Sequence, residues 1–170
     1  MTDNLFDVTV PDSELEAPAF EPIPTGPYRT TLQAGSGLVE NGKGWKAIRI
    51  PFLGFRDPKS GKEWQRSLNA QLTYENPNSP KSVQIGFAAI IGAAAALGLT
   101  EPTTTADGKP AQKLTAADMD ELVSQLNQMA GTEVEVYVTA GPRKRAGVVQ
   151  LKADGTPFLD NEIKRISAAR

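Results

Sequence analysis

Two short stretches of the sequence combine an aromatic ring with cationic side chains at alternate positions. Lys43, Trp45 and Arg49 fall on odd-numbered positions of one segment, and Trp64 and Arg66 are two residues apart in another. Side chains at positions i and i+2 of a strand point to the same face of a sheet. A ring beside guanidinium or ammonium groups suits stacking on unpaired bases together with neutralisation of phosphates. Tryptophan rings also belong in hydrophobic cores, so both roles stay open for each ring.

The densest basic cluster, Arg143-Lys144-Arg145, lies in a Gly/Pro segment between two predicted strands. A basic hairpin beside a sheet can grip phosphates, and a solvated loop tip explains the same charges equally well. We therefore expect a nucleic-acid-binding surface built from residues of these three stretches. Its predicted members are Lys43, Trp45, Arg49, Trp64, Arg66, Arg143, Lys144 and Arg145.

The composition narrows the chemistry that the chain can perform. The 170 residues include no cysteine and no histidine, whereas hydrophobic residues make up 39% and charged residues 22%. Disulfides, thiolate metal sites, imidazole bases and serine–histidine triads are therefore excluded. We expect a binding protein that is not an enzyme and that needs neither a cofactor nor a metal.

Two further motifs fit structural roles better than catalytic ones. Gly37 to Lys43 matches the start of a phosphate-binding loop, but Gly44 stands where Ser or Thr must bind Mg²⁺, and a strand follows instead of a helix. Asn41-Gly42 is a hairpin turn signal that explains the same residues. The acidic groups at 118–121 and 160–162 match no calcium or nuclease spacing, and acids favour a helix start.

Charge is unevenly distributed along the chain, although the net value is only −2. Residues 1–25 carry six acids and no base, residues 26–81 a net +5, residues 82–140 a net −5, and residues 141–170 a net +4. An acidic segment on a chain with two basic segments is either a solubilising arm or an intramolecular competitor for an anionic ligand.

The pattern of prolines, glycines and apolar residues predicts an arm and one domain. Residues 1–25 are proline-rich and acidic, and we expect an extended arm that docks in part on the domain or on a partner. Residues 26–170 form the domain. Period-two alternation predicts strands at 28–33, 45–55, 64–74, 133–140 and 148–152.

Helices are expected on either side of a polar loop of about 15 residues. The first covers 81–97, and its alanines and glycines favour close packing as a buried helix. The second follows Thr115 as N-cap with Asp118 at the third position, and Gly131 ends it. A short helix at 161–169 closes the chain. The resulting fold class is α+β with a mainly antiparallel, curled sheet, and an OB-like barrel is one form that such a sheet can take.

We expect a cytoplasmic protein without a membrane span. No basic region opens the chain as in a secretory signal, and the apolar stretch 83–99 is short for a bilayer and rich in alanine and glycine.

Several motifs together resemble a phage-encoded family of unknown function. They are Pro24-Thr-Gly-Pro-Tyr28, Arg66-Ser-Leu-Asn69, Asn76 to Ser82 before an Ala/Gly helix ending Ala96-Leu-Gly-Leu99, Leu122 to Gly131, and Val134 to Val138. The resemblance covers residues 22–140. Members of this family tend to be encoded beside replication and recombination genes and are suspected single-stranded-DNA-binding proteins. The resemblance implies that sheet aromatics and basic loops meet the strand. The present chain differs from the usual phage single-strand binder in placing its acidic segment at the N-terminus.

Three functions remain open at this stage. The first is a phage single-stranded DNA-binding (or RNA-binding) protein that acts in replication or recombination in the host cytoplasm, with homo-oligomers and other replication proteins as partners. The second is a virion component, a capsid-decorating or head–tail protein that uses its arm for assembly. The third is an inhibitor of a host enzyme whose acidic arm mimics nucleic acid.

Overall fold

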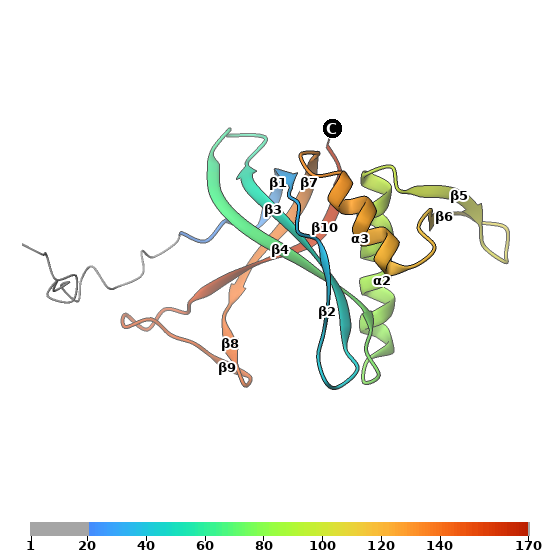
Figure 1. Cartoon of the computed structure of the whole chain (residues 1–170). Helices are drawn as coiled ribbons and strands as arrows, with labels where there is room; N and C mark the ends of the chain where they lie inside the picture. The colour runs from blue at the N-terminus through green and yellow to red at the C-terminus, as the bar shows by residue number, and fades with distance from the viewer. Residues whose placement is uncertain (1–20, 170) are drawn as a thin grey trace, which may run out of the picture.

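The computed structural model describes residues 21–169 (Figure 1). The strands are β1 (Gly26–Leu32), β2 (Gly37–Glu40), β3 (Lys46–Arg56), β4 (Glu63–Glu75), β5 (Thr100–Thr104), β6 (Pro110–Leu114), β7 (Glu133–Pro142), β8 (Lys144–Arg145), β9 (Val148–Val149) and β10 (Leu159–Ala168). The helices are α2 (Pro80–Ala96) and α3 (Met119–Gln128). All strand pairings are antiparallel, so the predicted α+β class is confirmed.

One curled sheet of six strands forms the centre of the molecule. Strands β10, β7, β1 and β3 follow one another across it, and β4 pairs with the other edge of β3. β1 and β2 share one edge of β3, since β1 pairs with residues 52–56 and β2 with residues 46–49. β4 and β10 come into contact at the two ends of the sheet, but they do not pair as strands. The sheet therefore does not close into the OB-like barrel that the sequence allowed as one of its forms.

The inner face of this sheet provides most of the hydrophobic core. The predicted alternation is confirmed on two strands, where Ile48, Ile50 and Phe52 on β3 and Val134, Val136 and Val138 on β7 are buried. On β4 the even-numbered residues point the same way, because Ala70 and Leu72 are buried and their odd-numbered neighbours face outward. The odd-numbered side chains of β4 therefore lie on the outer face of the sheet, and the exposed Arg49 and Leu53 continue this face on β3.

Helix α2 covers the seam between β4 and β10. It packs against both strands, and Gly86 lies so close to β4 that an added Cβ would sit 1.9 Å from the Thr73 carbonyl oxygen. Ser79 caps the helix by accepting a hydrogen bond from the Ser82 N–H, and Pro80 occupies the first turn. The helix predicted at 81–97 is confirmed, although only one side of it is buried. Neither described helix has the length and apolarity of a membrane-spanning helix.

The prediction of a helix at 161–169 is wrong, because this segment forms β10 and pairs with β7 along its length. Ile163 and Ile166 are both buried although they are three residues apart in this strand. The pairing with β7 shifts register between Ile163 and Arg165, and the extra residue in this bulge places both isoleucines on the inner face.

Two further local expectations need correction. The polar loop before α3 is a β-hairpin, β5–β6, which carries no apolar alternation that would have indicated strands. Helix α3 begins one turn later than predicted: Asp118, not Thr115, is the N-cap and accepts a hydrogen bond from the Glu121 N–H at 2.8 Å.

The end of the expected arm is docked on the domain. Ile23 is fully buried, and its backbone N–H donates to the side-chain oxygen of Asn161 at 2.9 Å. Tyr28 donates its hydroxyl to the Pro24 carbonyl, and burial, followed by the nearby Asp57 carboxylate, raises the pKa of this phenol. The rest of the arm, residues 1–20, lies outside the described residues.

Candidate nucleic-acid interface

The first part of the candidate interface lies on the outer face of β3. Trp45, directly before this strand, is half-buried, and its indole N–H donates to the Thr73 hydroxyl oxygen at 3.1 Å. Thr73 points outward from β4, so the hydrogen bond holds the indole on the outer side of the sheet. Arg49 is exposed on the same face. The predicted pairing of Trp45 with Arg49 on one surface agrees with this placement.

Polar side chains without charge continue this surface onto β4. Its exposed outward residues are Gln65, Ser67, Asn69 and Gln71. Gln71 lies directly across from Arg49, and Ser67 from the exposed Leu53. We call these four residues with Trp45, Arg49 and Leu53 the outer strip. It combines a ring, a cation and amides, and it is bordered at the start of β4 by the exposed Glu63, whose carboxylate accepts a hydrogen bond from Gln65 at 3.5 Å.

Lys43 is exposed in the turn that joins β2 to β3. Its backbone N–H donates to the Asn41 side-chain oxygen, which also accepts from the Trp45 N–H. Asn41 therefore orders the turn that the Asn-Gly signal predicted, and it places Lys43 two residues from the ring of Trp45 in sequence.

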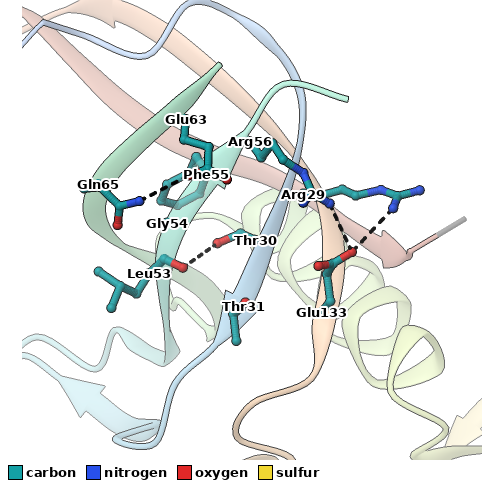
Figure 2. A pocket seen from close by; sticks show the side chains of 10 residues that line it. All are labelled: Arg29, Thr30, Thr31, Leu53, Gly54, Phe55, Arg56, Glu63, Gln65 and Glu133. Atoms are coloured by element: carbon teal, nitrogen blue, oxygen red, sulfur yellow. Dashed lines mark hydrogen bonds and ion pairs between the residues drawn. The ribbon is translucent and has the colours of Figure 1, made fainter. Parts of the chain in front are cut away.

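A shallow pocket of about 150 Å³ borders the outer strip at its other end (Figure 2). Leu53 and Gln65 belong to both, and Gly54 opens the pocket through a bulge with a φ of +75°. Arg29 and Arg56 enter it from β1 and β3, and the Glu133 carboxylate lies 3.5 Å and 3.7 Å from them. Glu63 also lines the pocket, so the two guanidinium groups are matched by two carboxylates and the pocket adds no net charge beside the strip.

Trp64 does not present its ring to solvent. Only 9% of this residue is exposed, and its ring packs edge-on against Tyr28 at a centroid distance of 5.5 Å. The Lys62 ammonium lies 4.7 Å from the ring centroid. The core role left open in the sequence thus fits Trp64, and base stacking on it does not fit this placement.

Arg66 shares the inward side of β4 with Trp64, as predicted, but it holds the arm to the sheet. Its guanidinium donates to the Asn161 side-chain oxygen at 2.8 Å and to the Glu21 carbonyl oxygen at 3.4 Å. Asn161 also donates to the carbonyls of Ile23 and Thr139. Arg66 is therefore a structural residue of the β4–β10 seam, and we remove it from the candidate surface.

The predicted basic cluster lies on a projecting extension. We define the hairpin extension as residues 143–159, which include β8 and β9 and lie at the lower left of Figure 1. Lys144 and Arg145 are exposed and make no ion pair with residues of the range 21–169. Arg143 differs, because its guanidinium contacts the Asp160 carboxylate at 2.9 Å and lies 5.2 Å from the Phe158 ring centroid.

The structure groups the predicted residues at three places. Lys43, Trp45 and Arg49 belong to the β2–β3 turn and the first half of β3, Trp64 and Arg66 lie on β4, and the basic cluster follows the end of β7. Trp64 pairs across from Phe55 at the far end of β3. Ten residues of strand separate this position from Trp45, which is about 33 Å at the rise of a strand. The two tryptophans therefore do not form one stacking surface.

Sequence reasoning missed several residues of these regions. Phe158, Lys152 and the exposed valines Val148 and Val149 accompany the basic cluster. The apolar residues of the extension were a possible signal, but alternation alone did not say that they face solvent. No group of acidic residues within 21–169 is arranged to hold a metal ion.

Comparison with known proteins gives no family for this chain: no family model matches it, and no curated protein matches it significantly.

Proposed function

We propose that this protein binds single-stranded nucleic acid, as a phage DNA-binding protein of replication or recombination in the host cytoplasm. The observation that carries this proposal is the outer strip, in which an anchored tryptophan lies on the same face as an exposed arginine and four uncharged polar side chains. Unpaired bases can stack on the ring, while their edges meet the amides of Gln71 and Asn69.

The charges around the strip support contacts to the backbone of the strand. Lys43 precedes Trp45 in the β2–β3 turn, Arg49 follows it on β3, and Arg29 and Arg56, both paired with Glu133, border the far end of the strip. Lys144 and Arg145 offer a second group of cations on the hairpin extension. Contacts of this kind depend little on base sequence, so we expect binding with weak sequence preference.

Titration of a fluorescent oligonucleotide at two salt concentrations tests this function directly. We expect binding that weakens with salt, with a slope of log K against log salt of roughly −0.7 for each phosphate neutralised. Single-stranded DNA and RNA, and a duplex of the same length, are compared under the same conditions. Affinity that is absent, or that does not change with salt, would exclude the proposal.

Substitution of Trp45 locates the binding site. Trp45→Ala should weaken binding by about 1–3 kcal/mol, the usual contribution of stacking on one base, whereas Trp45→Phe should retain part of it. Thr73→Val is the matched control for positioning, because it removes only the acceptor of the indole N–H. Equal affinities for wild type and Trp45→Ala would place the site elsewhere.

The salt dependence of binding distinguishes cations that contact phosphates from cations that do not. Arg49→Gln and the pair Lys144→Gln/Arg145→Gln should each reduce the salt slope, by roughly 0.7 per lost contact. Lys59→Gln, in the β3–β4 turn outside the strip, serves as the control. An unchanged slope in a variant removes its residue from the interface.

A structural role in the virion is the second candidate. It is favoured by the exposed apolar side chains of the hairpin extension and of α2, among them Val148 and Ile85, each 62% exposed. Large apolar groups at the surface mark sites of protein contact. Presence of the protein in purified particles, without affinity for oligonucleotides, would select this function.

A further inference from the structure

The hairpin extension combines apolar and cationic side chains that the rest of the domain does not cover. Of the nine large exposed hydrophobic residues in the described chain, five belong to it. They are Val148, Val149, Leu151, Phe158 and Leu159. Residues 143–159 also contain four basic residues and one acidic residue. Among residues 21–169, β8 and β9 pair only with each other, and an isolated two-stranded ribbon is marginally stable in water. Such a surface suits a partner that is both apolar and acidic.

The 20 residues that precede Glu21 have this complementary character. They contain five carboxylates and no lysine or arginine. Phe6, Val8 and Val10 alternate with Asp7 and Thr9, so an extended conformation would place the apolar groups on one side. These apolar and acidic side chains complement the apolar and basic side chains exposed on the extension.

The path of the chain brings this segment to the base of the extension. Ile23 is bonded to Asn161, two residues after the extension ends, and the Thr25 hydroxyl oxygen accepts from the Ala140 N–H, three residues before it begins. Seven strand residues from Arg143 to Val149 span about 23 Å. Twenty residues reach up to about 70 Å when extended, so the segment can cover the whole extension.

We propose that residues 3–16 dock in cis along the hairpin extension, with their apolar side chains on Val148 and Leu151 and their carboxylates beside Lys144 and Arg145. In addition, and resting on the proposed function, the docked arm covers cations that would meet phosphates, so arm and nucleic acid compete for the extension. The other surface within reach is the groove of about 610 Å³ between α2 and β10, which has Lys164 and Arg165 at its border. The groove complements the acidic arm less well than the extension does, since Glu162 pairs with Lys164 at 3.0 Å.

A spin label tests the docking without nucleic acid. The chain has no cysteine, so Ser13→Cys in the full-length protein gives one labelling position, and Thr105→Cys in the β5–β6 turn gives a control position. We expect paramagnetic broadening of the backbone amides of residues 144–151 from the label at position 13 and not from the label at 105. A mixture of labelled unenriched protein with unlabelled ¹⁵N-enriched protein should show no such broadening, because the contact is within one chain.

Three outcomes would overturn the docking. Broadening confined to β10 and α2 would assign the groove instead, broadening that persists in the mixed sample would assign a second copy, and unbroadened hairpin amides would leave the arm undocked. A change of Val148→Ser with Leu151→Ser should reduce the broadening, since these residues supply the apolar contact, and both side chains are exposed enough for the fold to tolerate the change.

Oligonucleotide titration tests the competition separately. Asp3→Asn, Asp7→Asn, Asp12→Asn, Glu14→Gln and Glu16→Gln, combined in one variant, should bind single strands at least about fivefold more tightly than wild type, the lower end of common coupling between sites. Equal affinity of the two proteins would overturn the competition while leaving the proposed function intact. If neither protein binds oligonucleotides, the proposed function fails, and the spin-label result alone decides the docking.

Discussion

Asn161 is the side chain on which the most distant parts of the described chain converge. Its amide donates to the Ile23 and Thr139 carbonyls, and its oxygen accepts from the Ile23 N–H and the Arg66 guanidinium. No alternation or motif indicated this role, because it depends on a partner 138 residues away.

Asn161→Ala should therefore lower the free energy of unfolding by about 2–3 kcal/mol, because it leaves the backbone groups of buried Ile23 without partners. Chemical denaturation monitored by fluorescence measures this loss. Asn69→Ala, an exposed position on β4, should stay within about 0.5 kcal/mol of wild type. A similar stability for the two variants would mean that the Asn161 bonds contribute little.

The two tryptophans should respond differently to substitution. Trp64→Ala should cost about 3–5 kcal/mol of stability, since it empties a core position beside Tyr28. Trp64→Phe should cost less, because the buried indole N–H finds no acceptor among the described residues. Intact binding by folded Trp64→Phe, set against the weak binding expected of Trp45→Ala, would confirm that only Trp45 contacts the ligand.

At the scale of the elements, the packing of α2 on β4 depends on the close approach of Gly86 to the backbone of Thr73. Gly86→Ala would bring its Cβ within 1.9 Å of the Thr73 carbonyl oxygen, so helix and strand must separate, at a cost of about 3 kcal/mol or more.

Gly92→Ala is the matched control for Gly86→Ala in the same helix. Its Cβ would meet only the Ile166 carbonyl oxygen at 3.9 Å, an ordinary contact, so we expect a gain of about 0.5–1 kcal/mol from helix propensity. Urea denaturation of both variants measures the contrast. Equal stabilities would contradict the packing of α2 against β4.

Two turns hold ionised aspartates. The pKa of Asp154 is lowered by hydrogen bonds from the Thr156 hydroxyl and then its N–H, and the pKa of Asp57 is lowered first by the Lys59 N–H and then by the Ser60 hydroxyl. Because these pKa values are depressed on folding, their stabilisation is present above the unfolded pKa of about 3.9 and is lost as pH falls through the folded value.

NMR titration of the carboxyl carbons should therefore give midpoints below 3.8 for both residues. Thr156→Ala should move the Asp154 midpoint upward and leave that of Asp57 unchanged. A midpoint of Asp154 that does not move would show that the Thr156 bonds do not hold this turn.

The sequence was most informative about elements with regular patterns. Alternation in β3 and β7, the Asn41-Gly42 turn signal and the Ala/Gly stretch at 81–97 identified strands and a helix within a few residues. The errors arose where no regular alternation marked a strand: β10 contains a bulge that interrupts its alternation, and the polar β5–β6 hairpin has no buried face.

At the scale of the whole molecule, the candidate site could be predicted only in part. Spacing along one strand correctly put Trp45 and Arg49 on one face, because that relation is local. The separation of Trp64 from Trp45 could not be predicted, since it depends on which face of a curled sheet points into the core. The distribution of charge along the sequence could be interpreted only with the fold, in which Glu21 pairs with Lys62 and Ile23, two residues later, bonds to Asn161 near the base of the hairpin extension.

The bonds between Ile23 and Asn161 also bear on how the protein folds during synthesis. Strand β1 pairs with β7, more than 100 residues later, and β10 must then close against residues near the start of the domain. Such high contact order slows folding, and it cannot be satisfied until most of the chain has left the ribosome. The apolar helix α2, already synthesised by then, would wait without its strand partner β10, so we expect yields in cells to improve at low temperature or with added chaperones.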